Sequence, residues 1–104
     1  MYLIREMSEE FGLTKRAIRF YEQKGLLKPS RDTTMLNVPR VYNDEDRARL
    51  AEIVMLTKMG FTLNEIASGN ISADQYRQQL VLCVDKIVEL QESIVLLEER
   101  LRNG

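Results

Sequence analysis

The sequence predicts a mainly α-helical protein, in which a small domain of short helices precedes one long coiled-coil helix. Three observations support this fold class. Apolar residues recur every three or four positions in several short segments, Gly and Pro separate those segments, and residues 73–102 contain neither Gly nor Pro. We therefore expect a first domain at residues 1–70 and the long helix within residues 72–104.

The first 25 residues predict two short helices joined by a tight turn. Apolar residues share one face of a helix over residues 4–11, and Gly12 follows in the position where a left-handed residue ends a helix. Thr14 is a favourable N-cap for the second helix, which we expect to end before Gly25. Two short helices around a Gly-containing turn predict a helix-turn-helix unit.

Residues 30–42 interrupt this helical pattern. They are rich in Asp, Thr, Asn and Pro and are flanked by short strand-like pieces, so we expect a β-hairpin with a long tip. Asn43 or Asp44 should cap the next helix, whose apolar positions keep helical spacing up to Gly60. Thr62 should cap a short helix after it.

The last helix carries an unbroken heptad pattern, which is typical of a coiled coil. Its core positions alternate steps of four and three residues and are Tyr76, Leu80, Cys83, Ile87, Leu90, Ile94, Leu97 and Leu101. A second apolar stripe, which widens this face, consists of Val81, Val84, Val88 and Val95. A chain of this size buries little apolar surface alone, so the pattern predicts a partner that covers this face.

Charge is distributed unevenly along the chain. The net charge is −1, but residues 12–42 contain seven basic and two acidic residues, a net charge of +5. Residues 50–104 have a net charge of −3. A basic segment within an acidic protein predicts a localised phosphate-binding face.

The residue types present exclude several function classes. The chain has no His and a single Cys, so a zinc site of ordinary ligands or a catalytic triad with His cannot form within it. We expect no enzymatic activity, no cofactor and no metal. We interpret Cys83 as a small apolar core residue, in preference to a metal or redox sensor. No apolar run is long enough to cross a membrane and no signal peptide is evident, so we expect a cytoplasmic protein.

Residues 12–29 carry a specific motif and read GLTKRAIRFYEQKGLLKP. This stretch resembles the signature of the MerR family of transcription regulators, which carry an I-R-Y-Y-E-x-x-G-L-L-x-P run at this distance from the start. The similarity covers roughly residues 2–67. It implies a winged helix-turn-helix DNA-binding domain followed by a long antiparallel coiled-coil dimerisation helix.

The resemblance also implies roles for residues of the second helix. Thr14, Lys15 and Arg16 would face the major groove of double-stranded DNA. Arg19 and Tyr21 would contact phosphates, which suit an Arg fork and a Tyr hydroxyl. Phe, at position 20, replaces the first Tyr of the family pair, and we expect it to pack in the core.

The wing departs from the family pattern. Members usually carry Gly-Tyr-Arg in its second arm, whereas residues 38–40 are Val-Pro-Arg. The resemblance implies that Arg31, Arg40 and Tyr42 belong to the DNA-binding site, the last two bracing the wing on the backbone. The tip, residues 31–37, is longer and partly apolar. It would fold back onto the domain, contact RNA polymerase or another protein, or lie over the sugar-phosphate backbone.

Three functions are compatible with this pattern. The resemblance implies a sequence-specific transcription regulator that binds a (pseudo)palindromic promoter site as a homodimer, with no dedicated effector domain. An architectural or recombination-directing DNA-binding protein is the second, although such winged proteins usually lack the long helix. A protein-interaction adaptor that uses the apolar wing is the third. Salt-dependent binding to DNA separates the first two functions from the third.

Overall fold

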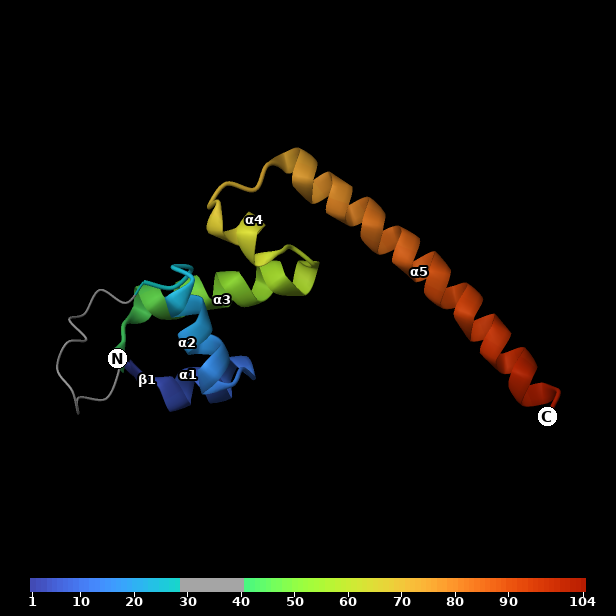
Figure 1. Cartoon of the computed structure of the whole chain (residues 1–104), viewed down its shortest axis with the longest axis horizontal. Coiled ribbons are helices and arrows are strands. Elements are labelled where there is room, and N and C mark those ends of the chain that lie inside the picture. The colour runs from blue at the N-terminus through green and yellow to red at the C-terminus, as the bar shows by residue number, and fades with distance from the viewer. Residues whose placement is uncertain (29–40) are drawn as a thin grey trace. The chain divides into compact units, whose positions relative to one another are not determined.

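The computed structural model of the chain describes residues 1–28 and 41–104 and has the predicted mainly α fold. Its elements follow in the order β1 (Tyr2–Leu3), α1 (Ile4–Phe11), α2 (Lys15–Gln23), β2 (Val41–Tyr42), α3 (Asp44–Met59), α4 (Leu63–Ala67) and α5 (Ala73–Arg102) (Figure 1). The chain divides into two compact units, Met1–Gly69 and Asn70–Gly104. Each unit is described by itself below.

Helices α1 and α2 form the predicted helix-turn-helix. Gly12 ends α1 with φ 64°, a left-handed conformation that residues with a side chain rarely adopt. The turn is closed by a hydrogen bond from the Leu13 N–H to the Ser8 carbonyl, 3.1 Å long. Thr14 then caps α2, because its Oγ1 accepts a hydrogen bond from the Ala17 N–H at 3.0 Å. Short-range signals therefore determine both helix ends at this turn.

Helices α3 and α4 also begin where the sequence predicts. At the start of α3, the Asn43 side chain accepts a hydrogen bond from the Asp46 N–H, and the Asp46 carboxylate accepts one from the Asn43 N–H, both at 2.8 Å. This reciprocal pair is a capping box. Gly60, with φ 101°, ends α3, and Thr62 caps α4 together with Glu65. The turn between α3 and α4 is therefore fixed by local hydrogen bonds at both sides.

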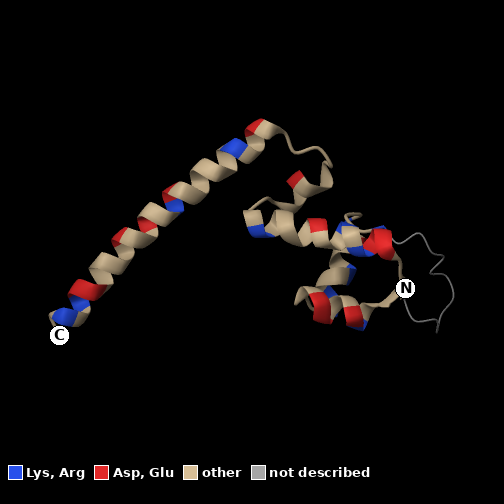
Figure 2. Cartoon of the chain, turned by 180° about the vertical axis from the view of Figure 1, so that it is seen from behind, with Lys and Arg blue, Asp and Glu red and all other residues tan. Residues whose placement is uncertain are grey.

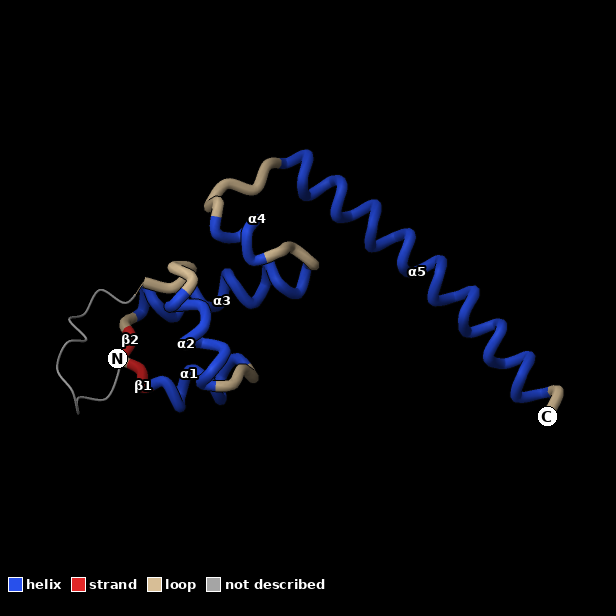
Figure 3. Tube along the Cα trace, viewed as in Figure 1, coloured by secondary structure: helices blue, strands red, loops and turns tan. Residues whose placement is uncertain are grey.

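A small two-stranded sheet joins the start of the chain to the residues that precede α3. β1 and β2 are antiparallel, with Tyr2 opposite Tyr42 and Leu3 opposite Val41 (Figure 3). The sequence analysis did not predict strand β1. The predicted β-hairpin falls mainly on residues 29–40, which lie outside the described part of the chain.

The core of unit Met1–Gly69 is formed by side chains from its helices, from strand β2 and from the segment after α2. Its largest fully buried side chains are Tyr42, Met7, Ile18, Leu27, Leu50, Ile53 and Ile66. They come from α1, α2, β2, α3 and α4 and from the segment that follows α2. Leu26, which lies in the same segment after α2 as Leu27, is also buried. This unit therefore buries its apolar residues within itself.

Helix α5 makes up most of the second unit and has the predicted length. Ser72 caps it, and its 30 residues correspond to a length of about 45 Å at 1.5 Å per residue. None of its residues is buried. Charged side chains occur along its whole length (Figure 2). Among the residues described, no helix combines the length and the apolar character needed to cross a membrane.

Candidate nucleic-acid interface

The predicted DNA-facing residues lie together at the start of α2. Thr14 precedes the helix, and Lys15, Arg16 and Arg19 are three of its first five residues. All four side chains are exposed. A helix N-terminus carries partial positive charge on its unpaired N–H groups, and three cations add to that charge here. The arrangement suits an anion that approaches this end of α2, such as a phosphate group.

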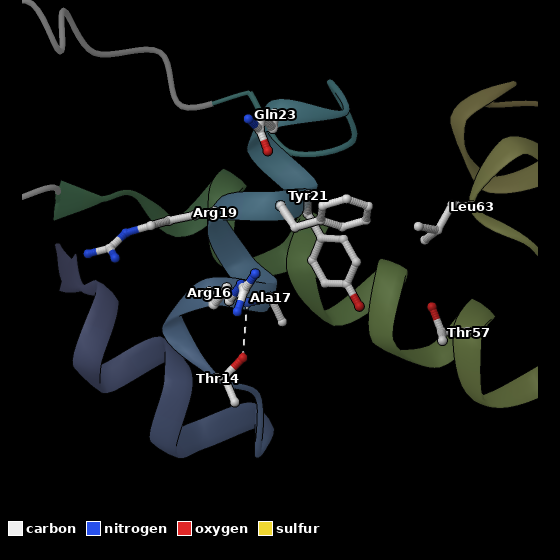
Figure 4. Close-up of a pocket in the computed structure, with 9 residues that line it drawn as sticks. Thr14, Arg16, Ala17, Arg19, Tyr21, Gln23, Thr57 and Leu63 are labelled. Carbon is white, nitrogen blue, oxygen red and sulfur yellow. Dashed lines mark hydrogen bonds between the residues drawn. The ribbon is translucent and has the colours of Figure 1, made fainter.

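A hollow of about 640 Å³ lies beside these residues. It is lined by Thr14, Arg16, Ala17, Arg19, Phe20, Tyr21 and Gln23, together with Thr57 of α3 and Leu63 of α4 (Figure 4). The sequence analysis did not assign the last two residues to the site. Their chain positions lie some forty residues after α2, so no local pattern could have joined them to it. The candidate interface therefore extends from α2 to the α3–α4 turn.

Side chains of α2 differ in direction around this hollow. In Figure 4, the Arg19 side chain points away from Thr57 and Leu63, whereas the Tyr21 ring lies on their side of the helix. Arg16 lies close to the Thr14 cap. The exposed guanidinium of Arg19 is therefore available to an approaching anion without any rearrangement of the core.

The two aromatic residues of α2 exchange their predicted places. Phe20 was expected in the core, but 40% of its surface is exposed, and the Lys24 ammonium lies 5.5 Å from its ring centre. That expectation was wrong. Tyr21, for which we expected a phosphate contact, is only 9% exposed. Successive residues on a helix point about 100° apart, so only one of the two can face the core.

Tyr42 also occupies a different place from the one expected. It has no exposed surface, and its hydroxyl donates a hydrogen bond to the Glu22 carboxylate of α2. A fully buried side chain cannot brace the wing on DNA, so the structure corrects this prediction. Arg31 and Arg40, the two other residues expected there, lie outside the described residues, as does the apolar tip expected to contact a protein partner.

A cluster of four polar side chains connects β1, α1 and α3 away from α2. The Arg47 guanidinium donates to both oxygens of Glu10, with Nε–O distances of 3.0 and 2.8 Å, and lies 5.4 Å from the Tyr2 ring centre. The Tyr2 hydroxyl donates to Asp44 at 2.9 Å. The hydrogen bond from Arg47 lowers the pKa of Glu10, and the bond to Asp44 raises the pKa of Tyr2.

Acidic side chains dominate this part of the surface. Figure 2 shows them gathered on α1 and at the start of α3. The exposed ones are Glu6, Glu9, Glu10, Asp44 and Glu45. Because they repel phosphate while the start of α2 attracts it, DNA is expected to approach the unit from one side only.

The predicted dimerisation residues all lie on α5, and each of them is exposed in the single chain. They include Leu90, which is 60% exposed, and Cys83, the one cysteine of the chain. Among the described residues, no group of three His, Cys, Asp or Glu side chains could hold a metal ion. The heptad residues thus form one exposed apolar surface along α5.

Comparison with known proteins identifies similar chains. A family model described as "MerR HTH family regulatory protein" matches residues 2–68. The mercuric resistance operon regulatory protein of Bacillus cereus is 32% identical over 97 residues, which cover 89% of this chain and 72% of that protein.

Two solved structures share the fold. The N-terminal part of MtaN, the multidrug transporter activator of Bacillus subtilis, is 26% identical with a TM-score of 0.70, and the match covers 97% of this chain and 98% of that one. HiNmlR, a MerR family regulator that lacks the sensor domain, was solved bound to promoter DNA. It is 27% identical with a TM-score of 0.60, and the match covers 96% of this chain and 86% of that one.

Proposed function

Because the chain belongs to the MerR family of helix-turn-helix regulatory proteins, we propose that it regulates transcription as a homodimer on a (pseudo)palindromic promoter site. Helix α2 of each copy enters the major groove with its N-terminal end first. The observation that carries this proposal is the group of exposed cations at the capped start of α2, Lys15, Arg16 and Arg19.

The electrostatics of unit Met1–Gly69 support this orientation. Exposed basic residues lie at the start of α2, while acidic residues gather on α1 and at the start of α3. Phosphate contacts fix the position of a protein on a duplex, and base-edge contacts give specificity. We assign Arg19 to phosphate, and Thr14, Lys15 and Arg16 to the groove. Arg can donate two hydrogen bonds to a guanine edge, so Arg16 is the residue expected to read a base.

The exposed face of α5 supports the homodimer. A monomer rarely leaves so long an apolar surface in water, and the heptad spacing of residues 76–101 fits a second helix of the same kind. The antiparallel orientation follows from the family resemblance, since heptads alone do not fix it. In such a dimer the two α2 helices are related by a two-fold axis, so they match half-sites about 34–36 Å apart, or a multiple of that spacing.

The relative HiNmlR supports the proposal that a helix-turn-helix unit and a long helix are enough for DNA binding. That relative lacks the sensor domain, was solved on promoter DNA, and 86% of its length is matched by this chain. By analogy, a helix-turn-helix unit and a dimerisation helix suffice to bind a promoter without a separate effector domain.

The proposed function is tested by selection from a library of random duplexes of about 40 base pairs, using the unmodified chain. We expect enrichment of one sequence with two-fold symmetry and binding that weakens steeply with salt. Arg19→Ala should weaken binding to all duplexes and reduce the slope of log K against log salt by about 1, whereas Arg16→Ala should change the enriched sequence.

Arg77→Ala is the matched control for these two variants. Arg77 is an exposed cation on α5 whose ion pair with Asp74 lies in solvent, so its removal should leave the affinity and the enriched sequence unchanged. Unchanged binding by the Arg19 variant would contradict the phosphate assignment. Failure to enrich any duplex would contradict DNA recognition itself and favour the adaptor function.

A further inference from the structure

Tyr42 and Glu22 join the sheet to the last turn of α2. The Tyr42 hydroxyl, on β2, donates a hydrogen bond to Oε1 of Glu22, 20 positions earlier in the sequence. Tyr42 has no exposed surface and Glu22 is half-buried. A buried phenol needs a partner for its hydroxyl, and an ionised carboxylate is a strong acceptor. The bond is therefore a directional link between two elements that are distant in the sequence.

We propose that Tyr42 and Glu22 are positioning residues that fix the rotation of α2 about its own axis and so aim Arg16 and Arg19 at DNA. This inference rests on the proposed function. Neither residue contacts DNA: Tyr42 is fully buried, and Glu22 carries the wrong charge for a phosphate. The pair acts on binding only through the orientation of α2.

Helix α2 is short, so few of its own side chains can fix its rotation about its axis. It has nine residues, and its buried side chains are Ile18 and Tyr21. Apolar burial is not directional, so these contacts hold α2 against the core while permitting small rotations. An Arg side chain extends far from the helix axis, and a small rotation therefore displaces its guanidinium appreciably. A hydrogen bond weakens when its geometry changes, so the bond to Tyr42 opposes such rotation.

The other end of this link is held firmly. Tyr42 lies opposite Tyr2 in the antiparallel pair of β1 and β2. The next residue, Asn43, is the N-cap of α3 and is held by its reciprocal hydrogen bonds with Asp46. The position of the Tyr42 side chain is thus set by the sheet on one side and by a helix start on the other. It can serve as a fixed reference for α2.

Three variants separate positioning from a purely structural role. Tyr42→Phe removes the donor, Glu22→Ala removes the acceptor, and the double variant removes both. The affinity of each variant is measured, across a salt series, for the duplex enriched by the unmodified chain and for a random duplex. Circular dichroism monitors the thermal unfolding of each variant. Tyr2→Phe is the matched control, since Tyr2 is the cross-strand neighbour of Tyr42 and its hydroxyl bonds to Asp44 instead of α2.

We expect each single variant to bind the enriched duplex about tenfold more weakly, because without the bond α2 adopts the binding orientation for only about a tenth of the time. Binding to the random duplex and the salt slope should change less, since the long Arg19 side chain can still reach a phosphate after a small rotation of α2, whereas a base-edge contact from Arg16 cannot tolerate it. The double variant should unfold at a higher temperature than Glu22→Ala, which removes the carboxylate acceptor of the buried Tyr42 hydroxyl, yet bind as weakly as either single variant. Glu22→Gln, which keeps an acceptor oxygen, should retain more affinity than Glu22→Ala.

Several results would overturn the inference. Binding like that of the unmodified chain by both single variants would show that the pair does not orient α2. A salt slope reduced by about 1 in Tyr42→Phe but not in Glu22→Ala would show a direct phosphate contact by Tyr42 instead. Recovery of affinity together with stability in the double variant would show a purely structural role. Enrichment of no duplex by the unmodified chain would overturn the proposed function and, with it, this inference.

Discussion

The two units of this chain differ in whether their apolar side chains are buried. Unit Met1–Gly69 buries side chains from four helices and a strand within itself, although it is only about twice as long as the second unit. Unit Asn70–Gly104 is almost entirely one helix, and no residue of α5 is buried. The first unit contains the interactions that make it a folded domain, whereas the second consists almost entirely of one helix whose apolar heptad residues are exposed.

Local helix signals do not account for this difference. Helices α2 and α5 begin in the same way, with the Thr14 and Ser72 side chains accepting a hydrogen bond from the N–H three residues later. What differs is the arrangement of apolar residues. Those of α2 meet side chains from other elements of the same unit, while those of α5 follow a heptad that suits a second long helix. The comparison teaches that packing against other elements, more than local helix propensity, decides whether a helix is stable within one chain.

The largest effect is expected for Leu90→Asp in α5. Leu90 is 60% exposed in the single chain and occupies the middle of the heptad seam. In a coiled coil this change places an unpaired charge from each chain in the interface, which should weaken dimerisation by at least about a hundredfold. Analytical ultracentrifugation should then find monomers at concentrations where the unmodified chain is dimeric.

Gln78→Asp is the control for that variant. Residue 78 lies on α5 outside both apolar stripes, so the same new charge should leave the dimer intact. A dimer that persists in Leu90→Asp would mean that the seam is wrongly assigned. A dimer lost in both variants would mean that charge alone, irrespective of position, prevents association.

The next effect concerns the core of the first unit. Leu50→Ala removes a fully buried side chain and should lower the free energy of unfolding by about 2–5 kcal/mol, because a cavity is left. Met55→Ala, on the same helix but 54% exposed, should lower it by less than about 1 kcal/mol. Urea unfolding of both variants measures the difference. Similar losses would show that the unit does not have the self-contained core described above.

The smallest effect is expected from the ion pair of Glu10 and Arg47. The hydrogen bond from Arg47 lowers the pKa of Glu10 below its ordinary value of 4.5. This pair therefore contributes stability above that value, and the contribution is lost as the pH falls through the lowered pKa. Between about pH 5 and pH 3, the melting temperature of the unmodified chain should fall more than that of Glu10→Gln.

Glu9→Gln serves as the control for the pH experiment, since Glu9 is an exposed neighbour on α1. Its melting temperature should follow that of the unmodified chain over the same pH range. Parallel curves for Glu10→Gln and the unmodified chain would show that the ion pair adds no measurable stability, as is common for pairs near the surface.

Much of the fold could be predicted because its helix ends are encoded locally. Gly12, Thr14, Asn43, Gly60 and Thr62 all end or cap helices as expected. The pairing of β1 with β2 could not be predicted in this way. Each strand has two residues, too few to show an alternating pattern, and the strands lie about 40 positions apart in the sequence.

The candidate site was predictable to a smaller extent. The cations of α2 follow from charge distribution and from the family motif, and they are exposed as a binding surface requires. The burial of Phe20 and Tyr21 was not predictable from the sequence. Two adjacent aromatic residues fit the helical period equally well, and only tertiary packing decides which of them is buried. Thr57 and Leu63 join the hollow only because the fold brings the end of α3 and the start of α4 to the same hollow as α2.

The exposed apolar face of α5 has a consequence for gene dosage. If α5 supplies the dimer, two chains must meet before either can hold a two-fold symmetric site. Below the dimer dissociation constant, promoter occupancy would then rise with the square of the chain concentration, by mass action. A twofold change in expression would alter occupancy about fourfold in that range. In that range, protein abundance would itself act as a graded input to the promoter.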